Sequence, residues 1–147
     1  MIAVTGALGF IGSAVVKALN DAGKSEIDLV DRPDTSDKWR NLNGLVFNKL
    51  MTPDEFDPSE YEQIFVLGHN SSTAISFAEA VKDYRNTLDI IEKAREETRV
   101  VYASSAGTYG TDGFSFSDDV IHELLPRSPY AMGKHMIDQW AKVQGKK

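Results

Sequence analysis

The chain has 147 residues, no cysteine and a formal net charge of −6, with 41% hydrophobic and 26% charged residues. This composition is that of a globular domain with a core of its own, and the lack of thiols excludes disulfides, thiolate catalysis and cysteine-ligated metals. The negative charge argues against nucleic acid as a main partner, but it does not exclude a phosphorylated cofactor. We expect a cytoplasmic protein, because no apolar run approaches the roughly 20 residues of a membrane span and the first residues do not resemble a signal peptide.

Strand-like and helix-like segments alternate along the first half of the chain. The short apolar segments predicted as strands are residues 2–6, 26–31, 44–48 and 63–68, of which 44–48 is the weakest. A helix is predicted from Phe10 to about Ala22, and Gly23 is a good residue to end it. The polar stretches 34–43 and 52–61 are predicted to form turns and short helical turns.

The longest predicted helix runs from about Thr73 to Glu97. Its apolar residues recur at steps of four and three and form a narrow seam: Phe77, Val81, Tyr84, Leu88 and Ile91. This spacing is typical both of a helix packed on a sheet and of a seam shared with a dimer interface, and the pattern leaves both alternatives open.

The last third of the chain repeats the alternation. A fifth strand is predicted at 99–105, a Gly- and Ser-rich loop at 107–119, and a final helix from Pro129 to about Val143. Strands that alternate with helices need crossover connections and therefore favour a parallel sheet. The predicted fold class is α/β, a doubly wound parallel sheet of five strands in a single domain spanning 1–147.

Three glycines lie between the first strand and the first helix. They are Gly6, Gly9 and Gly12, in the segment VTGALGFIG. Glycine allows a tight turn and a close backbone approach to a pyrophosphate, and the following helix N-terminus offers N–H groups and a favourable dipole. The spacing is G-x-x-G-x-x-G, and its place after a strand and before a helix favours a dinucleotide site over a purely structural turn.

Charged residues after the second strand bear on the choice of dinucleotide. Asp31 lies nineteen residues after Gly12, where a carboxylate can accept hydrogen bonds from an adenosine ribose. Asp31 alone favours NAD, whereas Arg32 and Lys38 would neutralise the additional phosphate of NADP. We expect NADP, with NAD as the alternative; the same two cations are also consistent with ordinary surface charge.

Tyr130 and Lys134 stand one helical turn apart after Ser128 and Pro129, which suit a helix start. A tyrosine needs nearby positive charge to act as a base near neutral pH, and Lys134 would supply it. Ser105, at the end of the fifth strand, would hold a substrate oxygen, since ligands bind at strand C-termini in such sheets. A Tyr-x-x-x-Lys pair alone is also common on helix surfaces, so its position in the chain gives it weight.

Together, TGALGFIG, Asp31, YASSAGTYG and YAMGK resemble the extended short-chain dehydrogenase/reductase family of NAD-dependent epimerases and dehydratases, over the whole chain and in order. Within the family, the pair Asn41–Leu42 and the SST at 71–73 look like the branch that epimerises nucleotide-activated heptoses, which are lipopolysaccharide precursors. The resemblance implies a Rossmann-type domain. It also implies that hydride would leave the heptose C6 carbon, giving a transient ketone, and return to the opposite face.

The resemblance implies a role for each candidate residue. Tyr130 would transfer the proton, Lys134 would bind the nicotinamide ribose and tune Tyr130, and Ser105 would position the reacting oxygen. The expected cofactor residues are Gly6, Gly9, Phe10, Ile11 and Gly12 at the pyrophosphate, Asp31, Arg32 and Lys38 at the adenosine ribose or its phosphate, and Leu67, Gly68 and His69 beside the fourth strand. No metal site is expected, since His69 has no partner ligands in the pattern.

The sequence departs from the family pattern in three ways. We expect the last strands and the substrate domain to be lacking, Asp83 stands where the family usually has Asn, and Pro53 replaces a basic residue near the cofactor phosphate, which weakens the case for NADP. The expected function is a nucleotide-sugar epimerase in short form, dimeric through helices 73–97 and 129–143. The alternatives are a non-catalytic NAD(P)-binding module that pairs with a full-length relative, and an interaction protein with a vestigial loop.

Overall fold

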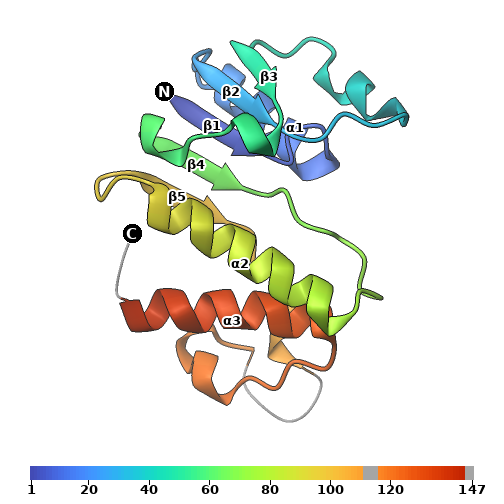
Figure 1. The fold of residues 1–147 in the computed structure, drawn as a ribbon, viewed down its shortest axis with the longest axis vertical. Helices are drawn as coiled ribbons and strands as arrows, with labels where there is room; N and C mark the ends of the chain where they lie inside the picture. The colour runs from blue at the N-terminus through green and yellow to red at the C-terminus, as the bar shows by residue number, and fades with distance from the viewer. Residues whose placement is uncertain (111–115, 145–147) are drawn as a thin grey trace. The chain divides into compact units, whose positions relative to one another are not determined.

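The computed structural model describes residues 1–110 and 116–144, and its five strands form one parallel sheet (Figure 1). The strands are β1 (Ile2–Thr5), β2 (Ile27–Val30), β3 (Lys49–Met51), β4 (Gln63–Val66) and β5 (Arg99–Tyr102). They lie in the order β3-β2-β1-β4-β5, and every neighbouring pair is parallel. This order is Rossmann-like and confirms the predicted fold class; the chain reverses its direction of travel across the sheet at β1, where such folds bind ligands.

The chain divides into two compact units. The first consists of residues 1–69 and 91–102 and contains the whole sheet and helix α1 (Phe10–Asp21). Of the described residues, the second contains 70–90, 103–110 and 116–144, with most of α2 (Phe77–Lys93) and all of α3 (Pro129–Gln144). Among residues 1–110 and 116–144, no helix has both the length and the apolar character needed to cross a bilayer.

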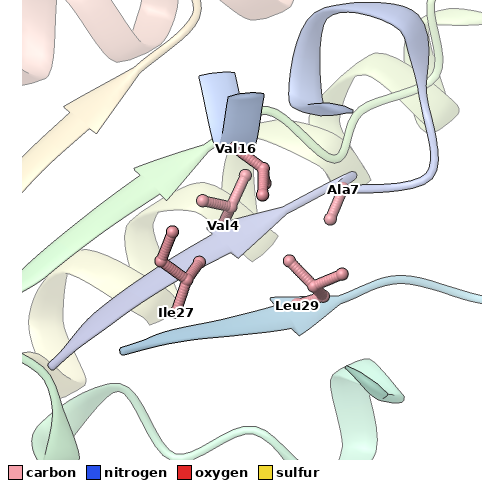
Figure 2. Close-up of a cluster of buried hydrophobic side chains, with 5 residues drawn as sticks. All are labelled: Val4, Ala7, Val16, Ile27 and Leu29. Carbon is pink, nitrogen blue, oxygen red and sulfur yellow. The ribbon is translucent and has the colours of Figure 1, made fainter. Parts of the chain in front are cut away.

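The core of the first unit lies between α1 and strands β1 and β2. Five side chains form it, all fully buried (Figure 2): Val4, Ala7, Val16, Ile27 and Leu29. Burying a Val, Ile or Leu side chain contributes roughly 1.5–3 kcal/mol. The cluster therefore holds α1 firmly on the two strands, and with it the loop that joins β1 to α1.

The predicted third strand at 44–48 is wrong, because the strand that pairs with β2 is Lys49–Met51. The side chain of Asn20 in α1 hydrogen-bonds to the backbone of Val46, in the segment that precedes β3. Its Nδ2 donates to the Val46 carbonyl at 2.9 Å and its Oδ1 accepts from the Val46 N–H at 2.8 Å. These two bonds occupy the groups with which Val46 would otherwise join a strand ladder, so pairing starts only at Lys49.

The fifth strand is shorter than predicted and ends at Tyr102 instead of 105. Ser105 is therefore not at the strand end but is the N-cap of the 3₁₀ helix Ala106–Tyr109, because its Oγ accepts from the Gly107 N–H. The remaining short elements match the predictions. The 3₁₀ helices Asp37–Leu42, Pro53–Glu55 and Pro58–Glu60 lie where short helical turns were predicted. The final helix is confirmed at Pro129–Gln144. Of the predicted loop at 107–119, residues 111–115 lie outside the described residues.

The longest helix is shorter than predicted, Phe77–Lys93 instead of 73–97. Ser76 and Glu79 set its start: the Glu79 carboxylate accepts from the Ser76 N–H at 2.8 Å, and the Glu79 N–H donates to the Ser76 Oγ at 3.3 Å. This reciprocal pair is a capping box. The predicted seam is buried only in part, since Ile91 is buried but Phe77 is 54% exposed. Ala80 and Thr87, which lie outside the predicted seam, are also buried.

Candidate functional site

The loop of residues 6–12, called the glycine loop below, joins the end of β1 to α1 and touches the end of β4. Gly6 has a φ of 66°, and a Cβ there would lie only 2.7 Å from the Cα of Gly68. The Thr5 Oγ1 accepts hydrogen bonds from the N–H groups of Leu67 and Gly68, both at 3.0 Å. The carboxyl ends of β1 and β4 thus meet in a tight contact that a side chain at position 6 would break.

The N-terminus of α1 suits an anionic group. Gly9 is its N-cap, no side chain caps the helix, and the first turn carries no acidic residue. Phe10 and Ile11 are 87% and 62% exposed, while Gly12 is buried in the first turn. A helix N-terminus presents N–H groups that lack an intrahelical partner. The glycine loop therefore fits the pyrophosphate of a dinucleotide.

Asp31 lies at the end of β2, beside the glycine loop. Its Oδ2 accepts from the Leu8 N–H at 2.8 Å and its Oδ1 from the Arg32 N–H at 2.7 Å. The Asn41 Nδ2 donates to the Leu8 carbonyl at 2.8 Å. Leu8 is therefore held through both its N–H and its C=O. Sequence reasoning proposed Asp31 as a ribose ligand and missed the role of Asn41 in fixing the loop, although Asn41 was part of the motif that carried the resemblance.

The two candidate cations for a phosphate are exposed. The Lys38 ammonium lies 3.1 Å from the Asp34 carboxylate. Hydrogen bonds from Ser36 and Lys38 lower the pKa of Asp34 to about 2, with the Ser36 bonds the larger cause. Exposed ion pairs are weak, so a phosphate would compete with Asp34 for Lys38 at little cost. Pro53 begins a 3₁₀ helix and offers no charge.

Leu67, Gly68 and His69 follow β4 in the same unit as the glycine loop. The contact between Gly68 and Gly6 brings two parts of the predicted cofactor site together. The N–H of His69 donates to the Leu67 carbonyl at 3.0 Å, which forms a tight turn at the strand end. These residues therefore shape the edge of the glycine loop.

The three residues predicted to be catalytic all belong to the second unit and are called the catalytic set below: Ser105, Tyr130 and Lys134. Tyr130 and Lys134 lie one turn apart on α3, and the Lys134 Nζ is 6.0 Å from the centre of the Tyr130 ring. The Ser128 Oγ accepts from the Ala131 N–H at 3.1 Å and supports the first turn of this helix. Ser105 is the N-cap of the 3₁₀ helix Ala106–Tyr109, its Oγ accepting from the Gly107 N–H at 3.1 Å.

Lys134 is only 5% exposed, which is unusual for a lysine. Its Nζ donates to the Ala103 carbonyl at 2.8 Å. Burial lowers the pKa of Lys134 from 10.5 to about 8, and the carboxylates of Asp83 and Asp138 act in the opposite direction. The ammonium therefore stays mostly protonated near neutral pH, and it is a positive charge fixed beside a phenol.

Two residues next to the catalytic set were not predicted from the sequence as site residues. The Ser104 Oγ donates to the Asp138 Oδ2 at 2.6 Å, and neither residue was a candidate. Asp138 follows Lys134 by one helical turn, so the i, i+4 spacing was the only available signal. Asp83, noted as a departure from the family pattern, accepts from the Asn70 N–H at 3.1 Å.

Comparison with known proteins places these features in a family. The sequence profile of the NAD dependent epimerase/dehydratase family matches residues 2–147. ADP-L-glycero-D-manno-heptose-6-epimerase of Nitratidesulfovibrio vulgaris is 33% identical over 159 residues, which are 99% of this chain and 49% of that relative.

Two solved structures agree with this result. UDP-glucose 4-epimerase of Thermotoga maritima matches with a TM-score of 0.71 and 26% identity, over 97% of this chain and 50% of that one. The NAD dependent NDP-hexosamine 5,6-dehydratase TunA matches with a TM-score of 0.72 and 26% identity, over 99% of this chain and 50% of that one. The chain thus spans about half the length of the relatives it matches. On these matches, and as its motifs predicted, the chain belongs to the NAD dependent epimerase/dehydratase family.

Proposed function

We propose that the chain carries the cofactor-binding and proton-transfer parts of an NAD(P)-dependent nucleotide-sugar epimerase similar to ADP-L-glycero-D-manno-heptose-6-epimerase. The observation that carries the proposal is the buried Lys134 ammonium one turn from Tyr130. Burying a lysine costs free energy, and a helix that packed only for stability would gain from an apolar residue there. The match of the NAD dependent epimerase/dehydratase family profile over residues 2–147 supports the same chemistry.

The first unit would hold the cofactor. Gly6, Gly9 and the first turn of α1 would receive the pyrophosphate, and Asp31 would meet the adenosine ribose. Arg32 and Lys38 would meet the additional phosphate of NADP, whereas the neutral Pro53 favours NAD. We keep NADP as the first expectation and NAD as its alternative, and one titration decides between them. The cytoplasm is the compartment where we expect both cofactor and substrate.

The second unit would handle the proton. When bound, the nicotinamide cofactor supplies the hydride acceptor and donor. Tyr130, as phenolate, would take the proton of the substrate hydroxyl as hydride leaves the carbon of that hydroxyl, so that a ketone forms. The Lys134 ammonium favours the phenolate through its charge, and the Ser105 hydroxyl would hold the reacting oxygen. Return of hydride to the opposite face, with the proton restored to oxygen, completes the inversion.

A second candidate is a non-catalytic NAD(P)-binding module that dimerises or pairs with a full-length relative. One observation favours it: the seam on α2 leaves Phe77 54% exposed. In this version α2 and α3 would form the interface and the catalytic set would be silent.

Calorimetric titration of the 147-residue protein with NADP and then NAD tests both versions, with Gly9→Val as the control for the glycine loop. We expect binding that the control loses, because a side chain at Gly9 would meet the Gly6 carbonyl, 3.2 Å from the position of a Cβ. Turnover of ADP-heptose that Tyr130→Phe abolishes would support the epimerase. Binding without turnover would favour the module, and no binding of either dinucleotide would refute both.

A further inference from the structure

The chain after β5 is tied to α3 by two side-chain hydrogen bonds. The Lys134 Nζ donates to the Ala103 carbonyl at 2.8 Å, and the Ser104 Oγ donates to the Asp138 Oδ2 at 2.6 Å. Lys134 and Asp138 are one turn apart and share a face of the helix with Tyr130. Two ties one turn apart fix both the position and the direction of residues 103–104 along α3.

The next residue, Ser105, starts a short helix that also touches α3. Its carbonyl accepts from the Thr108 N–H at 3.0 Å and from the Thr108 Oγ1 at 2.8 Å. A Cβ on Gly107 would lie 3.3 Å from the Cβ of Ala131, so this short helix lies against the first turn of α3. The contacts at Ser104 and at Gly107 therefore bracket Ser105 on both sides.

We propose that Ser104 and Asp138 are a positioning pair, whose hydrogen bond holds Ser105 in a fixed register along α3 relative to Tyr130 and Lys134. The catalytic meaning of this pair rests on the proposed function. A bond from a hydroxyl to a carboxylate is shorter and stronger than one between neutral groups. The 2.6 Å bond is therefore suited to hold a segment whose neighbour must present a hydroxyl to substrate.

Asp138 has a second effect, through its charge. The carboxylates that face Lys134 are Asp83 of α2 and Asp138 of α3. The other titratable neighbours on α3 are Tyr130, one turn before it, and His135, the next residue. Residues 103–110 contribute no charged side chain. Substitution at Asp138 thus removes both an anchor and a charge, whereas substitution at Ser104 removes only the anchor, and this difference separates the two effects.

Amide hydrogen exchange on the 147-residue protein tests the anchor. Ser104→Ala and Asp138→Ala should each speed exchange of the Thr108 amide about tenfold, the loss expected for one hydrogen bond to a charged group. Ser104→Thr keeps the hydroxyl and should restore the slow exchange, and the double variant should be no faster than either single one. Asp21→Asn, which removes the exposed ion pair with Lys17, is the matched control and should change nothing at Thr108. Unchanged exchange in Ser104→Ala, with the amides of β5 still protected, would overturn the proposal, as would full additivity in the double variant.

A titration of the Lys134 side chain by NMR gives the second readout. Asp138→Asn should move the pKa of Lys134 below its value of about 8, because a negative charge is lost, and Ser104→Ala should leave it in place. An unchanged pKa of Lys134 in Asp138→Asn would contradict the claim that the Asp138 carboxylate acts on Lys134. The cofactor titration is independent of both readouts. Cofactor binding with unchanged exchange refutes the pair alone, and altered exchange without cofactor binding refutes the proposed function while the anchor stands.

Discussion

Substitution of Gly6 by alanine should destabilise the protein by about 1–4.5 kcal/mol. Two effects add at this position. The φ of 66° costs a residue with a Cβ roughly 1–2 kcal/mol, and the new methyl group would lie 2.7 Å from the Gly68 Cα, an overlap of backbone that typically costs about 1–3 kcal/mol. Loss of glycine flexibility from the unfolded chain returns about 0.4–1 kcal/mol. Urea unfolding followed by circular dichroism measures the total.

Gly23→Ala is the matched control for this prediction. Gly23 has a φ of 78°, close to that of Gly6, but no atom lies within 4 Å of where its Cβ would be. The control should therefore cost at most about 1.5 kcal/mol, which is the left-handed penalty less the gain from a stiffer unfolded chain. Equal losses of stability in the two variants would refute the claim that β1 and β4 meet through Gly6 and Gly68. NAD(P) binding should be lost in Gly6→Ala and kept in Gly23→Ala.

Three further outcomes are expected. Tyr61→Phe should lower the free energy of unfolding by about 1–3 kcal/mol, because the buried hydroxyl donates to Asp28 at 2.7 Å. Tyr109→Phe is the control and should cost under about 1 kcal/mol, because its hydrogen bond to Asp118 is exposed. Equal urea midpoints of the two variants would contradict this prediction. Burial lowers the pKa of Lys134 from 10.5 to about 8, so the unfolded state binds more protons than the folded state between these two pH values. The free energy of unfolding should therefore rise with pH in this range, by at most about 3 kcal/mol. Urea unfolding at pH 7, 9 and 10.5 measures this rise, which Lys134→Met should flatten. Ser76→Ala should remove one half of the capping box and cost about 1 kcal/mol, visible as a lower thermal midpoint.

The sheet was predictable because each of its longer strands is a short, mostly apolar segment between polar or glycine-containing stretches. In β2, Ile27 and Leu29 face the core cluster, and both are fully buried. The third strand was not predictable in place, because nothing local distinguishes GLVFN from a strand. The deciding contact is the Asn20 amide on Val46, which joins residues 26 positions apart in sequence. A strand of three residues at the sheet edge carries too little pattern to outweigh such a contact.

The conformation of the glycine loop was predictable for the opposite reason. It depends on residues adjacent in sequence, so the motif itself contains the information that fixes the backbone of the loop. Gly9 is the N-cap of α1 and Asp31 follows β2, as the motif requires. The motif does not contain the distant residue whose hydrogen bond holds the loop in place. The Asn41 bond to the Leu8 carbonyl comes from 33 residues away, and only the fold brings the two together.

The surroundings of Lys134 depend on how two helices cross. Gly133 lies so close to α2 that a Cβ there would be 3.0 Å from the Ala80 carbonyl, and the neighbouring Lys134 is buried. Asp83 is one turn along α2 from Ala80, so the same crossing supplies a carboxylate that opposes the desolvation of the ammonium. An asparagine at position 83 would leave that opposition to Asp138 alone. The Asp83 carboxylate therefore offsets part of the desolvation of the buried Lys134 ammonium. Asp83→Asn should lower the pKa of Lys134, as Asp138→Asn should.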